Sequence, residues 1–243
     1  MKKIFVLKTG ATFKETASTR GDFENWVIAG LQIAPEQVGV INVLGGDALP
    51  QFDECAGVIV TGSHAMVTDN LPWSLALEQW LVMAVEHKVP IFGICYGHQL
   101  LAKALGGKVD YHPMGPEIGC FAIEVLPDAE NDPLFSHLPV QFNAHLTHHQ
   151  SVIAPPADAV VLASSAHEPH QAFRFGDSAW GVQFHPEYSR AVMADYTLHQ
   201  RQVIEQHQHN YDEIYAAIEE TPVAQNLLLL FSRFCGVKSL NAG

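Results

Sequence analysis

The sequence of 243 residues has few positive charges and no long apolar run. Its 13 Lys and Arg side chains stand against 26 Asp and Glu, giving a formal net charge of −13, and no basic cluster interrupts this balance. Nucleic-acid backbones bind proteins largely through basic residues, so we expect no nucleic-acid partner. No stretch approaches a transmembrane helix in length, and the four apolar residues before Lys8 are too few for a signal-peptide core. We therefore expect a cytoplasmic protein without membrane contact.

Cysteine is also scarce. Cys55, Cys95, Cys120 and Cys235 are widely spaced, without the pairing of a zinc site or the density of a disulfide scaffold. This usage fits a reducing compartment, in which a thiol stays free to react. With 48% hydrophobic and 16% charged residues, the chain can bury a substantial core, and we expect a single domain over 1–243.

An apolar run from Val89 to Ile94 stops at Cys95, and a helical pattern begins at once. Cys95 stands between Gly93 and Gly97, which is the cysteine form of a nucleophile elbow. The start of a helix favours thiolate over thiol. The structural alternative is a buried cysteine that acts as a small hydrophobe.

Strands and helices alternate in the first half of the chain. We expect helices at 22–31 and 72–87, and this alternation predicts an open α/β sheet of mostly parallel strands with helices on both faces. The strands are expected at 3–7, 38–44, 57–61 and 89–94.

Beyond residue 107 the pattern changes to strands separated by turns, which predicts an antiparallel flank. A C-terminal helical extension over 189–243 follows, with one helical stretch at 189–218 and a last helix at 222–234. Core packing is its preferred role, and a lid or a dimer contact are the alternatives. The strands of the flank are expected at 108–111, 120–126, 140–146, 159–163, 171–175 and 179–184.

A second motif, His185-Pro186-Glu187, ends the apolar strand at 179–184. A cysteine nucleophile needs a base to move its proton, and the base needs a carboxylate to orient it. Cys95, His185 and Glu187 supply those three parts. Taken alone, His185 would more often be a structural histidine and Glu187 a surface carboxylate.

Gly62 follows the strand at 57–61. An exposed N–H there, paired with the N–H of Tyr96, could stabilise an oxyanion. Many turns contain the pair Gly62-Ser63 for conformational reasons only.

The run Gly93-Ile94-Cys95-Tyr96-Gly97-His98-Gln99, with His185-Pro186-Glu187, resembles the class I glutamine amidotransferases, and most of all the glutaminase domain of GMP synthase. The resemblance covers about 40–190 and implies a flavodoxin-like sheet and no cofactor. It also implies hydrolysis of the glutamine side-chain amide through a γ-glutamyl thioester. The implied roles are nucleophile for Cys95, acid and base for His185, orientation for Glu187, oxyanion hole for Gly62 and Tyr96, and substrate binding for Gln99.

The chain departs from the family pattern at two places. Thr61-Gly62-Ser63 stands where Gly-Gly-Pro is usual, and Thr147-His148-His149-Gln150 stands where members like GMP synthase have Ser-His-Gly-Asp. Altered substrate contacts are expected there. The further candidate substrate-binding residues are Ser63, Thr147, His148 and His149.

No P-loop-like nucleotide-binding segment follows the glutaminase pattern. Three hypotheses remain open: an amidotransferase that supplies ammonia to a separate synthase, a γ-glutamyl peptidase or hydrolase with the same triad, and a non-catalytic regulatory protein. The expected small partner is glutamine or a γ-glutamyl compound, and a homo-oligomer is compatible with the sequence.

Histidine clusters raise the question of a metal. His145, His148 and His149 are close in sequence, but strand alternation would put the last two on opposite sides. His207 and His209, two apart on an expected helix, would point in different directions. We expect no metal at either place.

Overall fold

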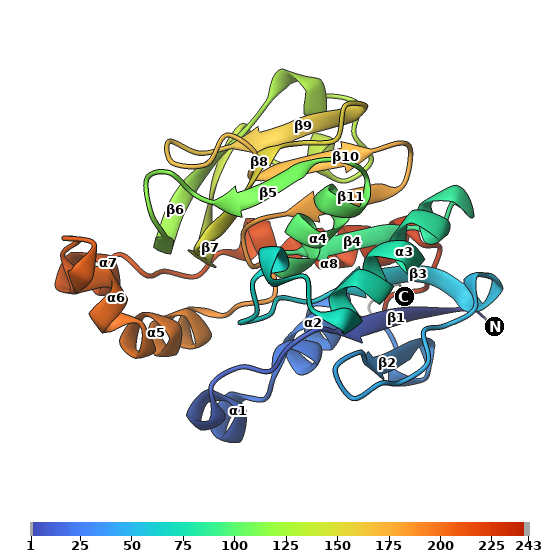
Figure 1. Ribbon diagram of the computed structural model, residues 1–243, viewed down its shortest axis with the longest axis horizontal. Coiled ribbons are helices and arrows are strands. Elements are labelled where there is room, and N and C mark those ends of the chain that lie inside the picture. Colours follow the sequence, from blue (N-terminus) through green and yellow to red (C-terminus); the bar gives the residue numbers. More distant parts are fainter. Residues whose placement is uncertain (1, 241–243) are drawn as a thin grey trace.

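The computed structural model describes residues 2–240 and shows a twisted open sheet with helices packed against it (Figure 1). The strands are β1 (Lys3–Lys8), β2 (Val38–Asn42), β3 (Cys55–Val60), β4 (Ile91–Ile94), β5 (Lys108–Tyr111), β6 (Glu117–Val125), β7 (Gln141–His148), β8 (Gln150–Ala154), β9 (Ala159–Ser164), β10 (Ala172–Phe175) and β11 (Ala179–Val182). The helices are α1 (Lys14–Arg20), α2 (Phe23–Leu31), α3 (Pro72–Glu86), α4 (Tyr96–Ala104), α5 (Arg190–His199), α6 (Arg201–Gln206), α7 (Tyr211–Ala216) and α8 (Pro222–Phe234).

The main sheet has a parallel part and an antiparallel part. Its order is β2-β1-β3-β4-β11-β10-β9-β6-β7, while β5 pairs with β8 in a separate small sheet. Neighbours from β2 to β11 run parallel, and those from β11 to β7 run antiparallel. The expected open α/β sheet with an antiparallel flank is therefore confirmed. The strands that precede the two motifs, β4 and β11, are direct neighbours.

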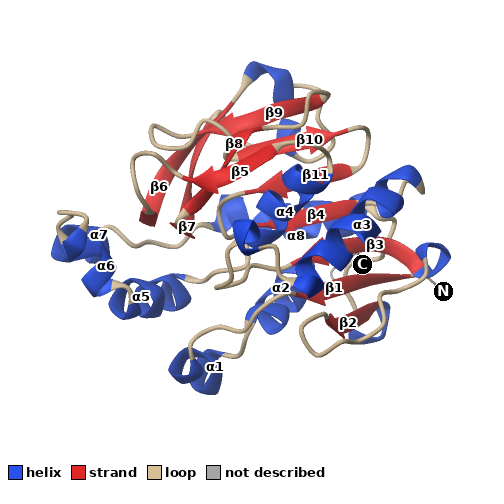
Figure 2. Ribbon diagram, in the orientation of Figure 1, coloured by secondary structure: helices blue, strands red, loops and turns tan. Residues whose placement is uncertain are grey.

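The apolar runs of the parallel strands are continuous because both faces of the sheet are covered. In β3, Ile59 packs into the core formed with α2 and α8, whereas Val58 and Val60 pack into the core formed with α3 and α4. Figure 2 shows these two pairs of helices around the strands. No helix among residues 2–240 has the length and apolar character needed to cross a membrane.

The C-terminal extension differs from the expectation in part. The single helical stretch predicted at 189–218 is divided into α5, α6 and α7, which lie beside β6 at one end of the sheet (Figure 1). A third apolar cluster, including Trp26, Met193 and Tyr196, joins this region to α2. The last helix begins and ends where the sequence predicts, at 222–234.

Candidate active site

Cys95 occupies a strained position between β4 and α4. Its φ is 49° and its ψ is −99°, a backbone conformation that non-glycine residues adopt at a cost of about 1–3 kcal/mol. The Cys95 N–H donates to the carbonyl of Val182 in β11 at 2.8 Å. A Cβ at Gly93 would lie 2.5 Å from the Gly97 carbonyl carbon, and one at Gly97 would lie 2.4 Å from the Val60 carbonyl oxygen. The elbow glycines therefore permit the close contact of strand, turn and helix.

His185 and Glu187 converge beside this elbow, though not at the end of a strand. Strand β11 ends at Val182, two residues before the predicted end at Phe184, and both side chains come from the turn that follows. The Nδ1 of His185 lies 2.8 Å from Oε1 of Glu187, and both side chains are buried. The His185 N–H donates to the carbonyl of His145 in β7 at 2.8 Å, which fixes the turn against the sheet.

The surroundings of His185 favour its protonated form. Burial by itself lowers the pKa of the imidazole, but the negative charges of Glu187 and Cys95 outweigh it and raise the pKa to about 10. The ring of Tyr188 stacks on the imidazole at 4.1 Å between centroids and 19° between planes. Among residues 2–240, Nε2 of His185 makes no hydrogen bond of ordinary geometry, and the Cys95 thiol lies close enough to it to help raise the pKa of the imidazole.

Gly62 lies beside His185, and Tyr96 directly follows Cys95. A Cβ at Gly62 would be 3.2 Å from Cε1 of His185. The Thr9 hydroxyl donates to the carbonyls of Thr61 at 2.9 Å and Gly62 at 3.2 Å, which ties the loop after β3 to the loop after β1. The Tyr96 N–H is in the first turn of α4, where backbone N–H groups lack helical partners.

A cavity of about 320 Å³ opens over Cys95. Each substrate-binding candidate from the sequence contributes to its wall, together with Cys95, Tyr96 and His185. Those candidates are Gln99, Ser63, Thr147, His148 and His149. The described structure thus brings together residues from segments that are distant in sequence.

Comparison with known proteins identifies the family. The model of the family glutamine amidotransferase class-I matches residues 47–211. The chain belongs to this family. The expectation drawn from the elbow and from His185-Pro186-Glu187 is confirmed at this level.

The similar proteins include GMP synthases and gamma-glutamyl peptidases. A glutamine-hydrolysing GMP synthase of Aeropyrum pernix is 37% identical over 153 residues, which cover 61% of this chain and 28% of that protein. One subunit of the glutamine-hydrolysing GMP synthase of Saccharolobus solfataricus is 42% identical over 42% of this chain and 53% of its own length. Gamma-glutamyl peptidase 4 of Arabidopsis thaliana is 27% identical over 73% of this chain and 72% of its own length. The chain thus spans about a quarter of the first synthase, but most of the peptidase.

Solved structures show the same fold. A glutamine amidotransferase of Thermotoga maritima aligns with a TM-score of 0.73 at 19% identity, covering 97% of this chain and 98% of that one. A glutamine amidotransferase of Methylobacillus flagellatus aligns with a TM-score of 0.71 at 22% identity, covering 98% and 96%. The C-terminal helices are therefore included in the structural likeness.

Two of the predicted substrate-binding residues, Gln99 and His148, also form hydrogen bonds that connect the segments lining the cavity. The Gln99 side-chain amide donates to the Gln150 carbonyl at 2.6 Å and to Oε1 of Gln183 at 2.9 Å. His148 is buried, with Nδ1 2.9 Å from the Gln150 carbonyl and Nε2 3.0 Å from Oε2 of Glu117. Glu117, 31 residues before His148, was not predicted from the sequence.

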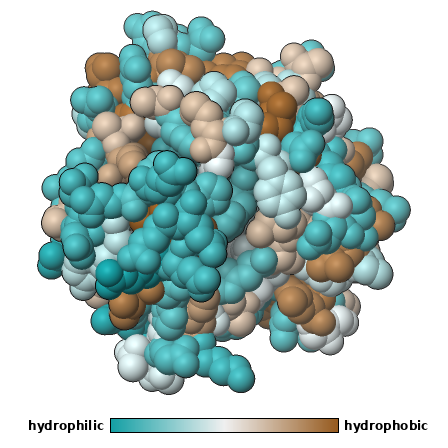
Figure 3. Space-filling view, turned by 60° about the vertical axis from the view of Figure 1, so that its left-hand side comes forward, coloured by the Kyte–Doolittle hydropathy of each residue, from teal (hydrophilic) through white to brown (hydrophobic). Residues whose placement is uncertain are grey.

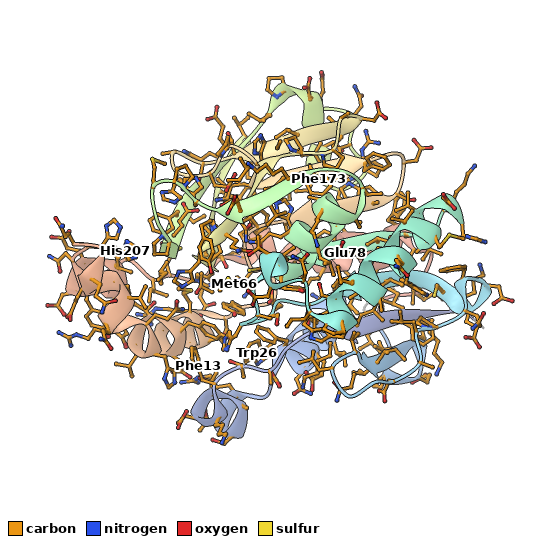
Figure 4. The ribbon with its side chains drawn as sticks, viewed as in Figure 1. Phe13, Trp26, Met66, Glu78, Phe173 and His207 are labelled. Atoms are coloured by element: carbon orange, nitrogen blue, oxygen red, sulfur yellow. The ribbon has the colours of Figure 1, made fainter. Side chains whose placement is uncertain are left out.

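The C-terminal extension forms part of the wall, which the sequence did not indicate. The Gln200 amide donates to the Thr147 hydroxyl at 2.6 Å and joins the end of α5 to β7 across the cavity. Tyr196, His199 and Val203 line the cavity from the same region. Figure 4 labels two further lining residues, Phe13 and Met66, between the C-terminal helices and the sheet. The extension packs in the core, as preferred, and also shapes the site.

The histidines considered as metal ligands are arranged separately. The Nε2 of His145 lies 2.9 Å from the carbonyl of Glu219, and His148 is held by Glu117. His207 and His209 are exposed, and their predicted place on a helix is wrong because α6 ends at Gln206. Among residues 2–240, no group of three or more His, Cys, Asp or Glu is placed to hold a metal ion.

Proposed function

We propose that this protein hydrolyses the side-chain amide of glutamine or of a γ-glutamyl compound through a thioester on Cys95. The observation that carries the proposal is the strained elbow of Cys95 beside His185, whose Nδ1 is held by Glu187 at 2.8 Å. A nucleophile, an acid and base, and an orienting carboxylate are the parts that this chemistry requires.

The residues of the site divide the proposed reaction among them. The Cys95 thiolate attacks the γ-carbonyl carbon, and the amides of Gly62 and Tyr96 stabilise the oxyanion. The imidazolium of His185 gives its proton to the leaving nitrogen, and the carbon–nitrogen bond breaks. His185 then takes a proton from water, which attacks the thioester, breaks the carbon–sulfur bond and releases a γ-carboxylate. Glu187 keeps the imidazole oriented and charged.

Two substrates suit this chemistry. Free glutamine, with ammonia passed to a separate synthase subunit, is supported by the family and by the 37% and 42% identity to GMP synthase proteins. A γ-glutamyl peptide or amide is supported by the peptidase, which matches 73% of this chain and 72% of its own length. Gln150 stands where the Ser-His-Gly-Asp pattern has its aspartate. The replacement of this carboxylate by an amide also favours a substrate other than free glutamine.

The experiment is release of glutamate and ammonia from glutamine, with γ-glutamyl dipeptides in parallel, by wild type and Cys95→Ala. Cleavage of either substrate that Cys95→Ala abolishes supports the proposal. Cleavage of glutamine alone selects the first substrate, and cleavage of dipeptides alone selects the second. No cleavage of any of them by wild type contradicts catalysis and favours a regulatory protein on this scaffold.

A further inference from the structure

The cavity over Cys95 is lined by two kinds of side chain. Amide, hydroxyl and imidazole groups come from Gln99, Thr147, His149 and Gln200. Rings in mutual contact, here called the ring wall, come from Phe13, His64, Tyr188, Tyr196 and His199.

The ring wall is continuous with the proposed acid. Tyr188 stacks on His185 at 4.1 Å, Tyr196 lies 4.9 Å from Tyr188, Phe13 lies 5.0 Å from Tyr196, and His199 stacks on Phe13 at 4.2 Å. Tyr188 and Tyr196 are buried, Phe13 is half-buried and His199 is exposed. The rings therefore lead from the imidazole outward to solvent.

The ring wall begins at the imidazole that would protonate the leaving nitrogen. The leaving nitrogen must take its proton from Nε2 of His185, so it lies against that imidazole when the carbon–nitrogen bond breaks. A substituent on that nitrogen then points away from the thioester and extends along the rings. For ammonia as leaving group, nothing would contact these rings.

We propose that the ring wall, in which the buried rings of Tyr188 and Tyr196 support the accessible rings of Phe13, His64 and His199, is a subsite for the amine half of the substrate, and that the preferred substrates are γ-glutamyl amides of amines with an aromatic or large apolar substituent. This inference rests on the thioester chemistry of the proposed function. Aromatic rings bind such substituents by stacking and by removing apolar surface from water.

The remaining surroundings agree with an uncharged substituent. Apart from Cys95 and the histidines, the side chains that line the cavity are uncharged, with no Asp, Glu, Lys or Arg among them, so a charged substituent would find no carboxylate, ammonium or guanidinium partner there. The end of the molecule that carries α5 to α7 is mainly hydrophilic on its outer surface, with a hollow beside it (Figure 3).

The test compares kcat/KM for three substrates that share one glutamyl half: glutamine, γ-glutamyl-methylamide and γ-glutamyl-benzylamide. We expect wild type to prefer the benzylamide over the methylamide by about tenfold, as burial of an aromatic ring provides. Phe13→Ala should reduce this preference to about twofold. Because the preference is a ratio measured in one preparation, partial unfolding of a variant does not change it.

A matched control comes from the same region. Leu198 is 59% exposed on α5, next to His199, and does not line the cavity, so Leu198→Ala should keep the wild-type ratio. Glutamine or methylamide cleavage without a preference for the benzylamide would overturn the subsite and leave the proposed function intact. Equal ratios in wild type and Phe13→Ala would also overturn it. No release of glutamate from any of the three would contradict the proposed function itself.

Discussion

Two cysteines, one half-buried and one buried, show what the surroundings of the candidate active site add. Cys235 follows α8, next to Gly57 of β3, and burial raises the pKa of its thiol. Cys95 is more deeply buried, with 7% of its surface exposed, but it lies at a helix start and beside an imidazole whose pKa is raised to about 10. A thiol in apolar surroundings is inert, whereas a protonated imidazole beside a thiol favours the thiolate, which is the reactive form.

The largest expected effect is a difference in kcat between variants of these two cysteines. Cys95→Ala should lower kcat for hydrolysis on the order of 10⁵-fold, because the thioester cannot form. Cys235→Ala should keep kcat within about twofold, because that side chain is remote from the cavity. Steady-state glutamate release measures both. Comparable losses of kcat in the two variants would contradict the distinction drawn between Cys95 and Cys235.

Removing the charge that holds His185 should have the next largest effect. Glu187→Gln should lower kcat about 10³-fold, since the imidazole loses its orienting carboxylate. The pKa of His185, raised to about 10 in wild type, should fall. The imidazolium is present below its pKa and is lost as pH rises through it.

That sign fixes the pH dependence of the His185 charge. In wild type the imidazolium should persist until pH approaches 10, and in Glu187→Gln it should be lost at lower pH. The NMR chemical shift of the His185 ring, followed from about pH 6 to about pH 10, measures the difference. Identical profiles for wild type and variant would exclude Glu187 as the source of the raised pKa.

Selective alkylation sharpens the comparison among all four cysteines. Burial raises the pKa of Cys55 to about 11, and it also raises the pKa of Cys120 and of Cys235. At about pH 7.5 we expect iodoacetamide to label Cys95 about 100-fold faster than these three. Peptide mass spectrometry identifies the labelled residue. Faster labelling of Cys120, which is half-buried, would contradict this order.

The smallest effect concerns the glycines beside each cysteine. A Cβ at Gly57 would lie 2.4 Å from Sγ of Cys235, and one at Gly97 would lie 2.4 Å from the Val60 carbonyl oxygen. Gly57→Ala and Gly97→Ala should each lower the free energy of unfolding by about 1–3 kcal/mol, measured by urea denaturation.

Only one of these losses should be recoverable. Adding Cys235→Ala to Gly57→Ala removes the obstructing sulfur and should restore part of the free energy of unfolding. For Gly97→Ala the obstruction is backbone, so no truncation of a neighbouring side chain can relieve it. Full stability of Gly97→Ala would show that the elbow does not need its glycine.

The sequence was sufficient where a signal is local. The elbow at Cys95, the alternation of strands and helices, and α8 depend on neighbours within a few residues, and each agrees with the structure. Helix α1 was missed because its segment, Lys14–Arg20, is polar and has no apolar periodicity. Strand β8 was missed because Gln150–Ala154 follows β7 after a single residue, without Gly or Pro to separate them.

The rest of the site depends on tertiary contacts that no local pattern encodes. Glu117 is buried because it meets His148 and Gln171, 31 and 54 residues away. Tyr196 reaches the cavity through the packing of α5 on Phe13 and Tyr188. One signal was available for Tyr188, since a large aromatic residue directly after Glu187 must lie close to the motif.

The most direct test of the central claim is capture of the acyl-enzyme. Wild type is mixed with γ-glutamyl-methylamide or glutamine, quenched in acid within the first turnovers and analysed by intact and peptide mass spectrometry. The account predicts one glutamyl group on Cys95, removed by hydroxylamine as expected for a thioester and absent from Cys95→Ala. Rapid hydrolysis with the glutamyl group on another residue, or unchanged hydrolysis by Cys95→Ala, would contradict it.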